Sequence, residues 1–241
     1  MLFDKFVSGW SPEWNAPVPD DAKRDFYRAA AGRSRGHLAE GLTSALNRRR
    51  RLVGTLDGKT LPVATDWRLV SGLGTGHPFE TGFIWHRTLG VPYLPGSSVK
   101  GVVRAWAQDW TEDRNKEETV RRLFGPEDAE ARVEAHAGSL IVFDALPVSP
   151  PLLEVYVMNP HYAPYYMRAE PPADYHSPTP IFFLTVAPGQ WFEFAVARRP
   201  GASGNDVETG IALLHDALST IGVGGKTAVG YGVFTNGQGQ S

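Results

Sequence analysis

A segment near the carboxyl end, Ile221–Gly232, contains five glycines and one lysine. Glycine reaches positive φ without steric cost, so Gly222, Gly224 and Gly225 can turn successive backbone N–H groups into one concavity, to which Lys226 adds a positive charge. Phosphate fits such a concavity, and a phosphodiester chain is its natural ligand. A tight connection between a helix and a last strand is the alternative. The segment is not a P-loop, because no helix is predicted to open on its Gly-Lys-Thr sequence.

A second segment, Tyr93–Trp110, begins with a Pro-Gly break and continues with helical periodicity. Ser97 or Ser98 is predicted to cap this helix, and Lys100 and Arg104 follow within its first two turns. Two cations and two hydroxyls near the positive end of a helix form a site for backbone phosphate. An ordinary amphipathic helix with a solvated charged face is the alternative. The predicted buried face consists of Val99, Val102, Val103, Trp106 and Trp110.

Together, Leu94–Arg104 and Gly222–Phe234 resemble the paired signature of the RAMP superfamily, the RNA-binding subunits of CRISPR effector complexes. Within that superfamily the chain most resembles the sixth-subunit family of the type III-B (Cmr) complex. Three further segments support this, in the order expected of that family: Gly138–Pro147, Met158–Tyr162 and Pro178–Leu184. The resemblance covers roughly residues 66 to 235.

The resemblance implies a non-catalytic subunit that holds the backbone of the CRISPR guide RNA (crRNA) near its 3′ end and reads no base. It also implies two protein partners in the Cmr complex, the backbone subunit and the first Cmr subunit. The RNA-binding residues carried over are Gly222, Gly224, Gly225, Lys226 and Gly230 in the loop, with Ser97, Ser98, Lys100 and Arg104 on the helix.

Catalysis is the rival hypothesis, because related RAMP subunits include ribonucleases. The loop of residues 74–86 contains His77, Glu80 and His86 but no aspartate. A histidine pair supports metal-independent RNA cleavage by general acid–base chemistry, whereas hydrogen-bonded structural histidines are the alternative. The chain has no cysteine, and its seven histidines show no metal-ligand spacing, so we expect no metal and no cofactor.

Composition sets the broad class of the protein. A chain of 241 residues with 42% hydrophobic content can bury one substantial core. The absence of cysteine, together with an amino end that resembles neither a secretory signal nor a membrane span, predicts a cytoplasmic protein with no membrane contact. The net charge is −2, yet residues 1–124 carry +5 and the remainder carries −7. This asymmetry suits a subunit that lies between RNA and a neighbouring protein.

The strongest predicted elements follow the order β-α-β-β-α-β, which indicates an α+β protein with a ferredoxin-like (RRM-like) core. Their ranges are 67–73, 97–110, 139–145, 181–197, 206–221 and 231–235. We expect residues 66–241 to form this domain, with a long insertion at about 159–180. Residues 1–65 are predicted to add an irregular amino-terminal arm and two helices, at 20–31 and 37–52. The second helix ends in the run Arg48–Arg51, which either contacts RNA or is a solvated helix end.

Overall fold

The computed structural model describes residues 3, 19–33, 35–77, 79, 81–112, 115–126, 137–159, 180–202 and 205–236. The predicted arm before Pro19 and most of the predicted insertion, residues 160–179, lie outside the described residues. The same holds for Glu80 and for the Pro160–Tyr162 part of one family motif.

The main sheet is antiparallel, with the strand order β2-β6-β1-β7. Its central pair is β1 (Lys59–Thr65) and β6 (Trp191–Arg198), in register from Lys59 opposite Val196 to Ala64 opposite Trp191. The edges are β2 (Leu140–Val142) and β7 (Phe234–Thr235), while β3 (Leu146–Pro147) pairs with β6 beyond β2. Because side chains alternate along a strand, β6 turns Phe192, Phe194 and Val196 to one face and Glu193 to the other.

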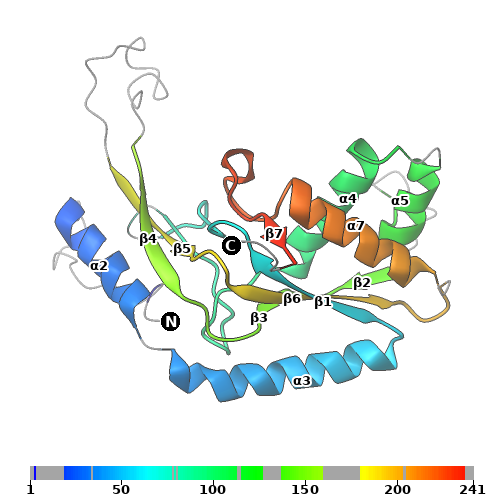
Figure 1. Ribbon diagram of the computed structural model, residues 1–241, viewed down its shortest axis with the longest axis horizontal. Coiled ribbons are helices and arrows are strands. Elements are labelled where there is room, and N and C mark those ends of the chain that lie inside the picture. The colour runs from blue at the N-terminus through cyan, green and yellow to red at the C-terminus, as the bar shows by residue number, and fades with distance from the viewer. Residues whose placement is uncertain are drawn as a thin grey trace, which may run out of the picture.

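Helices cover both faces of this sheet (Figure 1). On the face of the β6 phenylalanines, α7 (Asp206–Thr220) contacts all four strands, α4 (Gly96–Asp109) packs on α7 and β2, and α5 (Lys116–Phe124) packs on α4. On the face of Glu193, the long helix α3 (Ala39–Thr55) crosses β1 and β6 and follows the short helix η1 (Gly36–Leu38). The apolar residues of α7 and the sheet form the main core, which contains Phe192, Phe194, Leu214, Leu218 and Phe234.

A two-stranded sheet extends the molecule on the opposite side from α5 (Figure 1). It pairs β4 (Leu153–Met158) with β5 (Ile181–Val186), and α2 (Asp20–Gly32) lies against both strands. The hydroxyl of the buried Tyr27 on α2 forms hydrogen bonds with the segment that follows β1. It lies 3.0 Å from the carbonyl oxygen of Phe79 and 2.6 Å from Thr81 Oγ1. Leu69 in that segment forms an isolated bridge with Val186, which connects the small sheet to the rest of the molecule.

The structure is a mixed α/β arrangement with antiparallel sheets, and several predicted elements change position. The first strand is β1 at 59–65, whereas the segment predicted as a strand, 67–73, forms only the Leu69 bridge, because Gly72 turns the chain at φ +82°. The predicted strand 181–197 is two strands in two sheets, separated by a turn at Gly189 with φ +71°. The segment 139–145 holds only β2 and an isolated bridge at Ala145, and the final strand shortens to two residues.

Candidate nucleic-acid interface

Backbone hydrogen bonds hold the glycine-rich loop between α7 and β7 against the core. Gly225 N–H donates to the Val70 carbonyl at 2.7 Å, and Gly232 N–H donates to the Arg68 carbonyl at 2.8 Å. Gly222 N–H continues the helix to Ala217 at 3.0 Å, and Gly230 N–H closes the short helix η3 (Thr227–Val229) at 2.9 Å. In the described part of the chain, the N–H groups of Gly224, Lys226, Thr227 and Ala228 have no hydrogen-bond partner. Of these residues, Gly224 and Ala228 are exposed, and Lys226 and Thr227 are partly buried.

Close packing requires glycine at three positions of this loop, and a Cβ on Gly222 would lie 2.8 Å from the Gly232 carbonyl oxygen. A Cβ on Gly224, where φ is +106°, would lie 2.3 Å from the Val70 carbonyl oxygen. A Cβ on Gly232 would lie 2.0 Å from the Val223 carbonyl oxygen. All three distances are below van der Waals contact, so these glycines shape the loop whether or not a ligand binds. By contrast, nothing lies within 4 Å of a Cβ built on the exposed Gly230.

Lys226 has a left-handed backbone with φ +61°, which is rare for a residue with a side chain. Its Nζ lies 5.7 Å from the centre of the Phe183 ring on β5, a cation–π arrangement. Phe183 packs in turn with Val70 and Tyr231 in a small buried cluster. The charge of Lys226 is therefore placed where the loop meets the two-stranded sheet.

Arg68 lies beside the loop, between two aromatic rings. The sequence analysis did not single it out. The guanidinium of Arg68 lies 4.4 Å from the centre of the Trp67 ring and 4.7 Å from that of Tyr156, and it forms an ion pair with Glu154 at 2.9 Å. Trp67 is 43% exposed and Tyr156 is 39% exposed, so both rings present a face to solvent. Exposed aromatic rings next to a cation suit nucleotide stacking. The adjacent Trp67-Arg68 pair is the signal in the sequence that points to this feature.

Tyr231 lies in the same neighbourhood and packs against the Tyr156 ring, with the ring centres 6.2 Å apart. Burial raises the pKa of Tyr231, the proximity of Tyr156 raises it further, and the positive charge of Arg68 acts in the opposite direction.

The first turn of α4 is capped by a carboxylate and not by a serine. The helix begins at Gly96, whose N–H donates to Asp144 Oδ1 at 2.7 Å, and Ser97 and Ser98 are both exposed. The predicted serine cap is therefore wrong, because the acceptor comes from a residue 48 positions away in the chain. An anion already occupies the positive end of this helix, which leaves less attraction there for a phosphate. The exposed hydroxyls of Ser97 and Ser98 remain accessible.

Lys100 and Arg104 lie beside a third cation that the sequence did not place there, Arg199 at the end of β6. Burial lowers the pKa of Lys100, and the positive charges of Arg104 and Arg199 lower it further. Within the described ranges Lys100 makes no ion pair with a carboxylate. We name Lys100, Arg104 and Arg199 the α4 basic cluster. Positive charges held close together favour the binding of an anion.

The buried face of α4 also differs from the prediction. Val99, Val103 and Ala107 are buried, whereas Val102 and Trp106 are partly buried. Trp110 is 59% exposed and stacks on Trp106, with the ring centres 5.7 Å apart. The reason is that α4 ends at Asp109, so Trp110 stands at its end beyond the packing face.

The structure thus divides the nine predicted residues between two places. The glycine-rich loop contacts the segment at Arg68 and Val70 through Gly225 and Gly232, close to the edge strand β7. The first turn of α4 lies by Asp144, close to the opposite edge strand β2. The signature helix α4 and the helix α7, which precedes the glycine-rich loop, pack on each other on one face of the sheet.

The run Arg48–Arg51 is partly internal. Arg49 and Arg50 both form ion pairs with the buried carboxylate of Glu193, at 2.8 and 2.7 Å, so two of the four charges are paired within the protein. Arg48 and Arg51 are exposed on α3. The acidic partner could not be found from the sequence, because Glu193 lies 144 residues away from Arg49 in the chain.

The comparisons with known proteins agree with the motifs. The model of a family described as the RAMP superfamily matches residues 60–235. The chain belongs to the RAMP superfamily. It is 32% identical to the CRISPR system Cmr subunit Cmr6 of Pyrococcus furiosus over 236 residues, an alignment that covers 75% of this chain and 68% of the relative. It is 28% identical to the Cmr6 subunit of Saccharolobus solfataricus over 158 residues, covering 65% of this chain and 49% of that relative. The resemblance inferred from the motifs is confirmed.

A structural comparison supports the same fold. The RAMP chain matches a chain in the cryo-EM structure of the type III-B Cmr-beta complex bound to cognate target RNA, with a TM-score of 0.66. The two chains are 22% identical, and the match covers 88% of this chain and 70% of the other. At this level of identity the match establishes a shared fold.

The two histidines considered for catalysis are held by hydrogen bonds inside the RAMP chain. The Nδ1 atom of His77 accepts from the Phe79 N–H at 3.1 Å, and Nε2 lies 2.8 Å from the Phe3 carbonyl oxygen, so the proton resides on Nε2. The Nδ1 atom of His86 accepts from the Leu89 N–H at 3.3 Å. These contacts match the alternative that both residues are hydrogen-bonded structural histidines. In His77 both ring nitrogens take part in hydrogen bonds.

Two further observations concern the described residues only. They contain no group of three or more His, Asp or Glu side chains arranged to hold a metal ion. None of their helices combines the length and the apolar character needed to cross a membrane.

Proposed function

We propose that this RAMP chain is a non-catalytic guide-RNA-binding subunit of a type III-B CRISPR (Cmr) effector complex and holds the RNA backbone near the 3′ end of the guide in antiviral defence. The observation that carries RNA binding is the α4 basic cluster, in which Lys100 and Arg104 of the signature helix meet Arg199. The similarity to Cmr6 proteins along most of the chain supports membership of the complex.

The contacts are those of a phosphate backbone. Lys100 and Arg104 supply charge, the exposed Ser97 and Ser98 supply hydroxyl donors, and Lys226 supplies a second positive site. In the loop, the N–H groups of Gly224 and Lys226, which have no partner in the described part of the chain, supply further donors, while Gly222, Gly225 and Gly230 hold the loop in shape through their own hydrogen bonds. Such contacts fix the register of a nucleic acid and do not read its sequence.

The framework for these contacts is a ferredoxin-like βαββαβ core. Its support is the chain order β1, α4, β2, β6, α7, β7 and the sheet order β2-β6-β1-β7, with both helices on one face. The whole of β1, which precedes residue 66, and the elements from α4 to β7 make up this unit, and the helices α2 and α3 pack on it. We place the protein in the cytoplasm, with the backbone subunit and the first Cmr subunit as its neighbours.

Binding and cleavage are separated by one experiment. Purified chain is titrated with labelled single-stranded RNA at several salt concentrations, and the products are then resolved on a denaturing gel without added metal. We expect salt-dependent binding with intact RNA. Stoichiometric cleavage that disappears in His77→Ala or His86→Ala would establish the ribonuclease hypothesis instead. A chain that neither binds RNA nor co-purifies with other Cmr subunits would overturn the proposal.

A further inference from the structure

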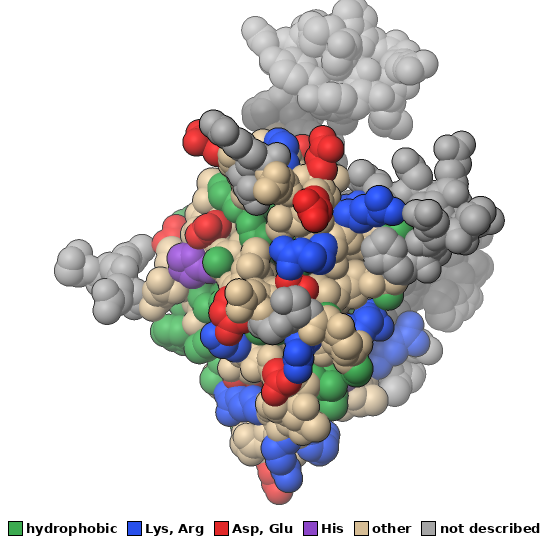
Figure 2. Space-filling view, turned by 90° about the vertical axis from the view of Figure 1, so that its right-hand side faces the viewer, with side chains coloured by type: hydrophobic (Ala, Val, Ile, Leu, Met, Phe, Trp, Pro, Cys, Tyr) green, Lys and Arg blue, Asp and Glu red, His purple; other side chains and the backbone are tan. Residues whose placement is uncertain are grey.

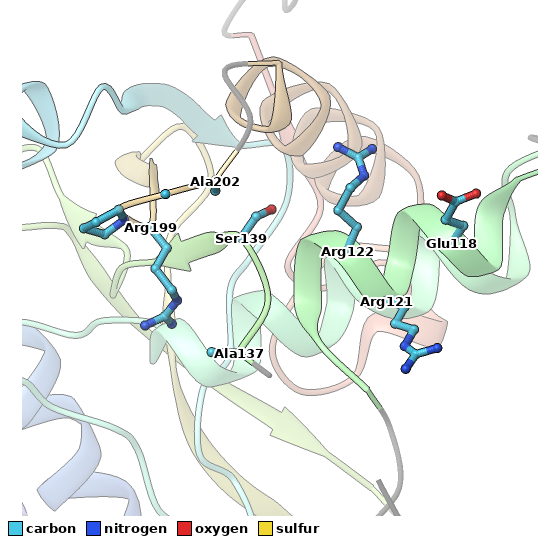
Figure 3. Close-up of a pocket in the computed structure, with 9 residues that line it drawn as sticks. Glu118, Arg121, Arg122, Ala137, Ser139, Arg199 and Ala202 are labelled. Atoms are coloured by element: carbon cyan, nitrogen blue, oxygen red, sulfur yellow. The ribbon is translucent and has the colours of Figure 1, made fainter. Parts of the chain in front are cut away.

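A pocket of about 380 Å³ opens between α5, the residues that lead into β2, and the turn that follows β6. Figure 3 shows the residues around it: Arg121 and Arg122 on α5, Ser139 before β2, and Arg199 after β6. Its volume falls within the usual range for small-ligand sites. Figure 2, which views this side of the molecule, shows Lys and Arg side chains interspersed with Asp and Glu.

The pocket wall holds a hydroxyl that lacks a hydrogen-bond partner. Ser139 Oγ is buried and has no partner among the described residues. In Figure 3 this oxygen points from the strand toward α5. Buried polar atoms in native proteins are nearly always satisfied by protein, water or ligand, so an unpartnered hydroxyl in a pocket wall is a candidate hydrogen-bond donor to a bound group.

Arg199 supplies a positive charge that is fixed in place but not neutralised. Its Nε donates to the Gly138 carbonyl at 3.0 Å, which orients the guanidinium. Within the part of the chain that the structure describes, its two terminal amino groups make no hydrogen bond and no ion pair. A planar guanidinium with both amino groups available is suited to phosphate.

The other charges at the pocket have different roles. Arg122 is paired with the carboxylate of the buried Asp206 at the start of α7, so its charge is largely compensated. Glu118 is exposed at the rim, where water screens its repulsion of an anion. Arg121 is exposed on the same helix and adds positive charge to the rim.

We propose that this pocket binds a phosphate of the RNA backbone, with Arg199 as the charged donor and Ser139 Oγ as a hydroxyl donor. The inference rests on the proposed RNA-binding function and extends it. Because Arg199 also belongs to the α4 basic cluster, the backbone runs from Lys100 and Arg104 past Arg199 toward α5. The RNA path therefore continues beyond the two signature motifs.

The test uses the full chain, mixed-sequence single-stranded RNA, and the variants Arg199→Gln, Arg199→Lys and Ser139→Ala. Glutamine keeps a donor for the Gly138 carbonyl but removes the charge, whereas lysine keeps the charge. The matched controls are Arg48→Gln and Ser44→Ala, exposed on α3 across the sheet. Thermal melting monitors the fold of each variant.

We expect Arg199→Gln to weaken RNA binding about tenfold and to lower the slope of log affinity against log salt by about 0.7, the value for one lost phosphate contact on a single strand. Arg199→Lys should restore the slope. Ser139→Ala should weaken binding a few-fold with the slope unchanged, and the controls should behave like wild type.

Three outcomes would overturn the inference in different ways. Wild-type chain that binds RNA, with an unchanged salt slope in Arg199→Gln, would remove the pocket from the RNA path and leave the proposed function standing. The same result with weaker retention of Arg199→Gln in the Cmr complex would identify an acidic protein segment as the ligand. Wild-type chain that binds no RNA would overturn the inference together with the proposed function.

Discussion

Arg49 on α3 donates to Glu193 on β6, with its amino nitrogen 2.8 Å from Oε1 of a carboxylate that is only 2% exposed. The same guanidinium donates to the carbonyl of Asp144 at 2.5 Å, and the carboxylate of Asp144 accepts the first N–H of α4. A line of polar contacts therefore connects the helix on one face of the sheet to the start of the signature helix on the other. These contacts tie the start of the signature helix α4 to α3 and β6, although none of the three residues is proposed to touch RNA.

The first prediction concerns this buried carboxylate. Glu193→Ala should lower the free energy of unfolding by about 3 kcal/mol, because it leaves the largely buried Arg49 without its counter-ion. Chemical denaturation measures the loss. Glu208→Ala, which breaks the exposed pair with Lys59, is the control and should leave stability unchanged within error. Equal stability of the Glu193 and Glu208 variants would show that the buried pair contributes nothing.

Adjacent glycines of the loop should respond differently to a single methyl group. Gly224→Ala forces its Cβ toward the Val70 carbonyl oxygen at positive φ and should cost about 2 kcal/mol or more of stability. Gly225→Ala meets only ordinary contacts, 3.6 Å or longer, and should change stability by less than about 0.5 kcal/mol. Thermal unfolding of the two variants side by side is the measurement. If Gly225→Ala proved the more damaging, the packing described for the loop would be incorrect.

Charge on α4 should matter for RNA far more than for folding. Lys100→Ala with Arg104→Ala should reduce the slope of log affinity against log salt by about 1.4, two contacts at 0.7 each, and to a similar degree for guides of any sequence. The control is Arg48→Ala with Arg51→Ala, which removes two exposed charges from α3. A wild-type slope in the α4 double variant, or a loss that depended on guide sequence, would contradict the proposed backbone contact.

The lowered pKa of Lys100 adds a pH dependence to this contact. A phosphate favours the charged amine, so binding is strongest while Lys100 is protonated and weakens as the pH rises through its lowered pKa. Wild-type affinity should therefore begin to fall at a lower pH than expected for an ordinary lysine. In Lys100→Ala this decline should disappear, and RNA titration across the alkaline range tests it.

The histidines provide a prediction about chemistry. His77→Ala and His86→Ala should leave target cleavage by the assembled complex near normal, because both rings are engaged in internal hydrogen bonds. His77→Ala should nevertheless lower the melting temperature, since it removes two hydrogen bonds and a stacking contact with Phe3, whose ring centre is 4.5 Å away. Loss of cleavage in a variant with unchanged melting would indicate a catalytic role.

Local patterns were sufficient to predict several elements from the sequence. The helical periodicity after Leu94-Pro-Gly predicted α4 to within about one residue, and the apolar face of 206–221 predicted α7. The two signature motifs predicted the RAMP superfamily. These features depend on residues that are close together in the chain, so their patterns can be read from the sequence alone.

Tertiary structure decided the elements and contacts that depend on distant partners. The first strand formed at 59–65 and not at 67–73 because β6 supplies a full register of partners there. Asp144, and not a serine, capped α4, and Arg199 joined Lys100 and Arg104, because the fold brings the ends of β2 and β6 next to that helix. A hydrogen bond or a charge contact across about 50 to 140 residues leaves no local pattern, so these residues became visible only in the folded chain.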